Sequence, residues 1–373
     1  MSITLESALA VAGIADWEAI QVLRDGFPSL VVRVPTSAFD GRQSIILKAC
    51  PVSSREPDVL ACLHRNGLPV PAVLDVREGY GFRVIVMEDV GADALHKHPD
   101  AEWYKAAVRE IAKIHRQFRL SCLTGGSRAA LTDLVPTYDD AKWAAVVWEG
   151  LQGTLRRIDD GTYATCGTLR ACGVVPKRGR EDLSGVLGDL AQKTLAMIED
   201  PSAYRPFPNV LVHGDYHDGN VLIRTPRPGE VAVPALPNPF AIVDWDSARW
   251  DSGFFDLVSL FDVSERMGTF YLDPEEIICI YLEAYADIHS DASAGIYSDT
   301  PADAYQHTYE DPHQATHQLE THPDGPTVCS AEAEWRRCRV LRAWGELKWF
   351  SETGEDFGDR IGREIRIIQT HLR

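Results

Sequence analysis

The sequence predicts an α+β protein made of two lobes, and three observations lead to this prediction. Short apolar runs typical of β-strands lie close to the N-terminus, at 20–34, 44–49, 73–76 and 82–87. Longer segments with apolar residues at helical spacing dominate the chain from residue 103 onward. With 373 residues, 45 % of them hydrophobic, the chain can bury two separate cores. We therefore expect an N-terminal antiparallel sheet with a helix, and then a larger, mainly helical lobe.

The predicted N-terminal lobe covers residues 1–91. It contains a strand pair around Asp25-Gly26, a dipeptide typical of hairpin turns, and a second pair around Gly79-Tyr80-Gly81. The last of these strands is buried and ends in a polar segment, 87–91. We interpret this break as a hinge to the second lobe, residues 92–373.

One strand of the first lobe, 44–49, carries Lys48 among isoleucine and leucine residues. Burying an unpaired charge is costly, so this lysine must be paired or must reach a polar site. The helix expected next begins near residue 53 and ends before Gly67. We expect Glu56, near its start, to be the partner of Lys48, with Asp58 as the second choice.

Two apolar strands of the second lobe each end in acidic residues. The first, 210–212, is followed by His213-Gly214-Asp215 and then by Asn220. The second, 240–243, ends at Asp244. Tight loops held between buried strands would direct several oxygen ligands toward one point.

Phosphoryl transfer from ATP needs a carboxylate beside the acceptor hydroxyl and oxygen ligands for Mg²⁺. Asp215 is the candidate for orienting the hydroxyl and accepting its proton, and Asn220 and Asp244 are the candidate metal ligands. Protein kinases use the same spacing in His-Arg-Asp, four residues, Asn. Lys48 would then contact the ATP phosphates. The hinge would offer backbone groups to adenine from Met87, Glu88 and Asp89.

Helical periodicity predicts the elements of the second lobe, at 103–119, 143–157, 184–199, 257–261, 275–286, 331–351 and 359–372. We expect loops at 121–140 and 159–182. Residues 291–324 carry seven acids, four histidines and no Lys or Arg, which is typical of a flexible excursion. The irregular spacing of these histidines argues against a metal site.

The overall charge and the cysteines restrict the class of protein. A net charge of -18 argues against nucleic-acid binding. No segment has the ~20 apolar residues of a membrane span, and the N-terminus lacks the basic start of a signal peptide. The eight cysteines form no Cys-x-x-Cys pair and lie in part among apolar residues. We therefore expect a cytoplasmic protein with reduced thiols and no membrane partner.

Together these motifs resemble the aminoglycoside phosphotransferase family, which belongs to the kinase-like superfamily with the choline kinases. The resemblance rests on Ile46-Leu47-Lys48, Glu56, Val86-Met87-Glu88-Asp89, His213 to Asn220, Ile242 to Asp246 and Asp256-Leu257, in the expected order. It implies a bilobal protein-kinase-like fold with a five-stranded sheet. It also implies ATP or GTP, Mg²⁺, and a small-molecule hydroxyl as the phosphoryl acceptor.

The resemblance also implies two supporting roles. His213 would brace the catalytic loop, and Asp256 would hold that loop through backbone N–H groups. The sequence departs from the family where Asp251-Ser252-Gly253 stands in place of a frequent Gly-Asp-Pro, and its first hairpin is poor in glycine. Because the helical lobe binds the substrate, the acceptor stays open among an aminoglycoside-like antibiotic, an amino alcohol and a sugar.

Other interpretations remain. A kinase-shaped protein can bind nucleotide and transfer nothing, and turnover measurements distinguish that case. The His-x-Asp-x-His spacing of His213, Asp215 and His217 also permits a metal hydrolase, which would carry stoichiometric Zn²⁺. A protein kinase is a third possibility, but no Ala-Pro-Glu segment follows Asp244.

Overall fold

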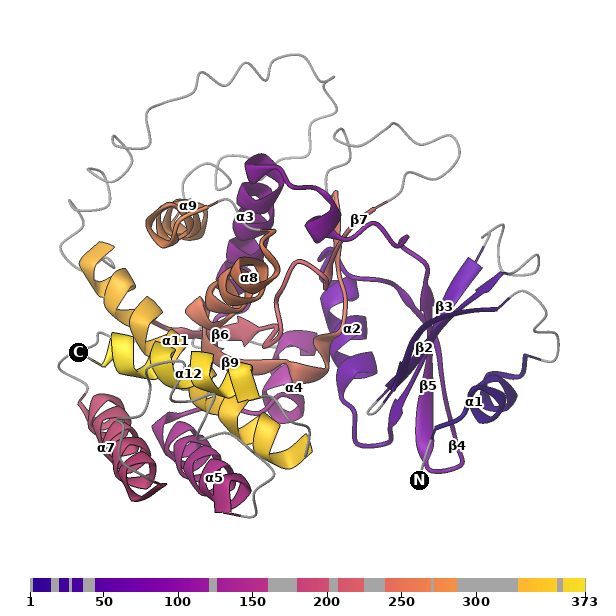
Figure 1. Ribbon diagram of the computed structural model, residues 1–373. Helices are drawn as coiled ribbons and strands as arrows, with labels where there is room; N and C mark the ends of the chain where they lie inside the picture. Colours follow the sequence, from indigo (N-terminus) through magenta and orange to yellow (C-terminus); the bar gives the residue numbers. More distant parts are fainter. Residues whose placement is uncertain are drawn as a thin grey trace, which may run out of the picture.

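The computed structural model describes residues 3–14, 20–26, 29–35, 44–120, 126–159, 180–200, 207–224, 239–269, 272–286, 328–353 and 358–372. It confirms the predicted α+β class: an antiparallel sheet lies on one side and a larger group of helices on the other (Figure 1). The predicted excursion at 291–324 and nearly all of the predicted loop at 159–182 lie outside the described residues.

The N-terminal sheet has five antiparallel strands in the order β1-β2-β3-β5-β4. The strands are β1 Gln21–Gly26, β2 Ser29–Pro35, β3 Ser44–Pro51, β4 Val73–Gly79 and β5 Phe82–Glu88. Both predicted hairpins are present. At the β4–β5 turn, Tyr80 has φ 51° and Gly81 has φ 79°, the positive values that a two-residue type I′ turn requires. The proposed lobe boundary at residue 91 follows β5 and stays a prediction.

Alternation along β3 decides which lobe Lys48 faces. Ile45, Leu47 and Ala49 join the core between the sheet and helix α1, Leu5–Ala12. Successive strand residues point to opposite faces, so Lys48 lies on the face away from α1. Ile46 and Cys50 form a small apolar cluster there.

Helix α2, Glu56–Arg65, connects the two lobes, and Figure 1 shows it between the sheet and the helices. Its Val59, Leu60 and Leu63 pack into the core of the helical lobe. The residue before the helix is Arg55, which makes no side-chain cap. Ser54 Oγ instead accepts the Glu56 N–H at 3.3 Å.

The helical lobe contains η1 Leu95–Lys97, α3 Ala101–Gln117, α4 Gly126–Leu134, α5 Asp140–Asp159, α7 Arg180–Glu199, η3 Trp245–Ser247, α8 Phe254–Met267, α9 Pro274–Ala286, α11 Val328–Thr353 and α12 Gly358–His371. Helix α4 corrects the prediction of a loop at 121–140. Its Leu131 is fully buried, and Arg55 Nη1 donates to the carbonyl of Leu134 at its C-terminal end (2.6 Å). Tertiary packing thus stabilises a helix too short for a clear periodic signal.

Two small antiparallel ribbons bring the acidic loops together. Strand β6, Asn209–Val212, pairs with β9, Arg249–Ser252. Strand β7, Val221–Ile223, pairs with β8, Phe240–Ile242. The predicted strand–loop–strand arrangement around the first acidic loop is therefore present. Among the described residues, no helix is both long and apolar enough to cross a lipid bilayer.

Candidate active site

The site begins at a buried lysine between two carboxylates. Lys48 Nζ lies 2.6 Å from Glu56 Oε2, and it also contacts Asp244 Oδ1. Lys48 is 6 % exposed and Glu56 is 1 % exposed. The structure therefore brings Lys48 and Glu56 together, whereas Asp58, the second choice, lies 3.8 Å from Arg83.

The charges in this group support one another. Burial alone would lower the pKa of Lys48, but the carboxylates of Glu56 and Asp244 outweigh it and raise the pKa. Burial raises the pKa of Glu56 to about 7, although Lys48 opposes that shift. Burial would also raise the pKa of Asp244, and the Lys48 ammonium holds it below its usual value instead. Lys48 is thus a charged ammonium facing an ionised Asp244.

Asp244 occupies an unusual backbone position at the end of the second acidic segment. Its φ of 66° and ψ of 56° are left-handed, a conformation that aspartate tolerates better than most residues. Its second oxygen, Oδ2, lies 3.2 Å from Arg24 Nη1 on β1. Sequence reasoning missed Arg24, because an exposed arginine in a hairpin carries no local signal for a partner so distant in the chain.

A cavity of about 120 Å³ brings three of the predicted groups together, whereas Asn220 and Glu56 are not among its lining residues. Its lining includes Lys48, Asp215 and Asp244, with Arg24, Ser29, Cys50, Pro51, Asp246 and Ser247. The predicted Lys48, Asp215 and Asp244, from three separate segments, therefore face a shared space.

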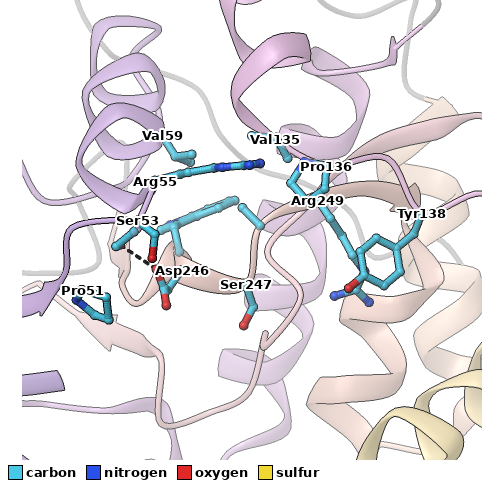
Figure 2. Close-up of a pocket in the computed structure, with 13 residues that line it drawn as sticks. Pro51, Ser53, Arg55, Val59, Val135, Pro136, Tyr138, Asp246, Ser247 and Arg249 are labelled. Carbon is cyan, nitrogen blue, oxygen red and sulfur yellow. Dashed lines mark hydrogen bonds between the residues drawn. The ribbon is translucent and has the colours of Figure 1, made fainter. Parts of the chain in front are cut away.

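A second cavity of about 460 Å³ adjoins it, and both are lined by Pro51, Asp246 and Ser247. Figure 2 shows Arg55 and Val59 on one side of this larger cavity and Asp246 and Ser247 on the opposite side. Ser54 Oγ donates to Asp246 Oδ1 (2.6 Å), which ties the start of α2 to η3.

Asp256, at the start of α8, anchors the loop before Asp215. Its carboxylate accepts the backbone N–H of His213 (2.7 Å) and of Gly214 (2.9 Å), and lies 3.0 Å from His115 Nε2. The side chain is fully buried. Burial alone would raise the pKa of Asp256, but the hydrogen bond from His115 lowers it. An ionised carboxylate thus fixes two successive backbone groups.

His213 ties the same loop to the strand that leads to Asp244. Its Nε2 lies 2.8 Å from the carbonyl of Val243, and its Nδ1 accepts the N–H of Asp215 at 3.2 Å. Nε2 therefore carries the proton and donates it to the carbonyl. Burial lowers the pKa of His213 and keeps the ring neutral. Both ring nitrogens of His213 are engaged, so neither has a lone pair free to bind a metal. The hydrolase interpretation requires such a lone pair.

Asn220 is held between the two acidic segments. Its side-chain Nδ2 donates to the backbone carbonyl of Asp215 (3.0 Å), and its backbone carbonyl accepts the N–H of Val243 (3.0 Å). The first bond fixes the orientation of the side-chain amide, and the second brings the backbone of Asn220 beside the residue that precedes Asp244.

Asp218 anchors the middle of the loop. It accepts hydroxyl groups from Tyr104 on α3 (3.0 Å), Ser264 on α8 (3.1 Å) and Thr269 (2.7 Å). Burial alone would raise the pKa of Asp218, but the neighbouring His217 and the hydrogen bonds from Thr269 and Tyr104 lower it to about 2. Sequence reasoning gave Asp218 no role, since its partners lie far away in the chain.

Gly214 must be a glycine, because its φ is +85° and a Cβ there would lie 2.2 Å from the carbonyl oxygen of Ser247. A left-handed φ combined with this contact leaves no room for a side chain. The residue before Asp215 is therefore fixed by the backbone of the facing segment.

Residues 87–89, the predicted hinge, make contacts that stabilise the N-terminal sheet. The Glu88 N–H donates to the carbonyl of Ala72 (2.9 Å), so this amide is engaged in the sheet. The Asp89 carboxylate accepts from Arg33 Nε and from Ser44 Oγ, both at 2.6 Å. Met87 is buried at the end of β5. Adenine binding by the backbone of Met87, Glu88 and Asp89 stays a prediction.

The chain is similar in fold to solved small-molecule kinases. Ethanolamine kinase from Plasmodium vivax has a TM-score of 0.53 at 10 % identity, over 98 % of this chain and 86 % of that one. Choline kinase from Cryptosporidium parvum has a TM-score of 0.53 at 12 % identity, over 95 % of this chain and 88 % of that one. A thermostable mutant of aminoglycoside phosphotransferase APH(4)-Ia, in complex with AMP-PNP and hygromycin B, has a TM-score of 0.53 at 14 % identity. The match covers 98 % of this chain and 97 % of that one. The fold is therefore kinase-like.

The family follows from the sequence itself. Residues 19–290 match the Phosphotransferase enzyme family, and this match covers well over half of the chain. The chain belongs to this phosphotransferase family, as its resemblance to the aminoglycoside phosphotransferases indicated. No curated protein matches the sequence.

Proposed function

We propose that this protein is a small-molecule kinase. It moves the γ-phosphoryl group of ATP or GTP, with Mg²⁺, to a hydroxyl group of a small polar molecule. The observation that carries the proposal is the single cavity shared by Lys48, Asp215 and Asp244. In a phosphotransferase family, this combination supplies a cation for phosphates, a base for a hydroxyl and a carboxylate for a metal.

Each residue of the site has a separate role in the proposed reaction. Asp215 is the base: it orients the acceptor hydroxyl and takes its proton as the phosphoryl group transfers. Lys48, fixed by Glu56, contacts the nucleotide phosphates. His213 and Asp256 keep the backbone of the Asp215 loop in place. Catalysis then depends on position and charge, because the transition state spreads negative charge over the phosphoryl oxygens.

The described residues fit Mg²⁺ bound together with a nucleotide. Asp244 offers a carboxylate and Asn220 an amide oxygen, and Mg²⁺ takes few protein oxygens beside phosphates and water. The described residues contain no cluster of three His, Cys, Asp or Glu side chains, as a metal site built by such side chains alone would need. A bound Mg²⁺ would neutralise phosphate charge.

The two side-chain cations that contact Asp244 would also bind the phosphates of the nucleotide. Lys48 and Arg24 contact the two oxygens of Asp244 and line the same cavity. Phosphates entering this space would attract both cations and leave the Asp244 carboxylate available to the metal.

The relatives and the charge of the chain support the proposed class of acceptor. The solved proteins with this fold include an ethanolamine kinase, a choline kinase and an aminoglycoside phosphotransferase. A net charge of -18 is compatible with a cationic acceptor. We propose an amino alcohol or an aminoglycoside-like antibiotic, with a sugar as the third class.

The test is ADP or GDP release with a panel of aminoglycosides, amino alcohols, choline and sugars. Asp215→Asn should lower kcat at least about 100-fold, as expected for loss of a general base, while nucleotide binding persists. Asp189→Asn is the matched control, since its side chain is exposed and pairs only with Lys193 among the described residues. Asp244→Asn should abolish Mg²⁺-dependent turnover. Nucleotide binding without phosphorylation of any acceptor would instead support a kinase-shaped binding protein.

A further inference from the structure

His217 is a polar residue of the Asp215 loop that the mechanism above does not use. Its Nε2 lies 3.7 Å from Asp215 Oδ2. Among the described residues, it is the only basic side chain within 4 Å of that carboxylate. The His217 side chain is 26 % exposed and that of Asp215 is 45 % exposed. Both side chains therefore lie at a surface that an acceptor can reach.

Hydrogen bonding fixes which His217 nitrogen carries the proton. Nδ1 accepts the N–H of Gly219 at 3.0 Å, so the proton of the neutral ring is on Nε2. Asp218 lies 3.9 Å from Nδ1, beyond hydrogen-bond distance. The ring therefore presents its only donor on the side of Asp215.

Gly219 makes room for this ring. A Cβ at position 219 would lie 2.8 Å from His217 Cε1 and 3.0 Å from its Nδ1. Any side chain there must displace the imidazole. The glycine thus supplies both the N–H that orients the ring and the space that the ring occupies.

We propose that His217 is a positioning residue for Asp215, an inference that rests on the proposed function. Its Nε2–H holds one carboxylate oxygen of Asp215 so that the other faces the acceptor hydroxyl. The separation of 3.7 Å is longer than a hydrogen bond, and such contacts often shorten once substrate is bound.

Steady-state kinetics test the role. Losing a hydrogen bond to a charged group should lower kcat about 10-fold in His217→Leu, with the KM for nucleotide unchanged. His217→Gln should keep kcat within about 3-fold of the unmodified protein, since its amide N–H reaches the position of Nε2. Equal losses in both variants, or a loss confined to KM, would overturn the proposal. Thermal unfolding of each variant separates misfolding from loss of position.

A double-mutant cycle tests the link to Gly219. Gly219→Ala should lower kcat about 5-fold in the unmodified protein but less than about 2-fold in a His217→Ala background, because the ring it displaces is then absent. Additive effects would show that Gly219 acts independently of the ring.

Imidazole ¹⁵N NMR tests the contact without turnover. The His217 resonances are those that disappear in His217→Gln, and in the unmodified protein they should show a protonated Nε2. Asp215→Asn should shift the Nε2 resonance, whereas Asp189→Asn should not. An Nε2 resonance that ignores Asp215→Asn overturns the inference even in an active enzyme. Absence of turnover with every acceptor would refute the proposed kinase activity alone, since the NMR result decides the contact by itself.

Discussion

Replacing Asp256 tests how strongly the fold depends on one carboxylate behind the active loop. In Asp256→Ala, the N–H groups of His213 and Gly214 and the ring of His115 lose their acceptor inside the protein. Each buried donor left unpaired costs about 1–3 kcal/mol, so the sum for the three donors is about 3–9 kcal/mol. That is a large part of the about 5–15 kcal/mol that stabilises a typical domain.

Asp256→Asn should cost less. Its remaining oxygen still accepts one backbone N–H, and its amide can donate to His115 once that ring changes tautomer. One backbone donor is then left facing another donor, which lowers the free energy of unfolding by about 1–3 kcal/mol. The comparison of the two variants therefore separates loss of acceptors from loss of side-chain volume.

Urea denaturation followed by circular dichroism measures both costs, with Asp189→Asn as the control on an exposed helix surface. We expect the free energy of unfolding to fall in the order control, Asn, Ala. If Asp256→Ala unfolds within about 1 kcal/mol of the unmodified protein, the bonds to His213 and Gly214 do not stabilise the loop as argued.

Three further predictions concern the same site. Gly214→Ala should unfold the loop and abolish turnover, whereas Gly268→Ala, with φ +67° and no neighbour within 4 Å, should cost only about 1 kcal/mol in thermal unfolding. Asp218 has its pKa lowered to about 2, so its stabilisation is present above its ordinary value of 3.8 and is lost as pH falls toward 2. Asp218→Asn should remove that part of the acid sensitivity in a pH titration of stability. Glu56→Gln should raise the KM for nucleotide about 10-fold by freeing Lys48, while an unchanged KM would refute the pairing role.

The contact between Lys48 and Glu56 could be predicted because each residue carries a local signal. A lysine inside an apolar strand must find a partner, and the first turn of the next helix offers acids that can pair with it. The hairpins and most helices were likewise confirmed, since the periodicity of apolar residues decides them within a short window.

The rest depends on contacts between distant parts of the chain. Asp218 meets Tyr104, 114 positions away, and Arg24 meets Asp244, 220 positions away. No local pattern indicates either contact. Helix α4 was missed because packing of Leu131 and a bond from Arg55 stabilise it, rather than its own periodicity.

The register of β7 and β8 has a practical consequence. Asn220 precedes Val221 and Asp244 follows the strand that contains Ile242, and Val221 lies opposite Ile242. This pairing sets the spacing of the two proposed ligands, whatever the length of the connection at 225–238. A shift of this register by one residue would therefore change the position of one proposed ligand relative to the other.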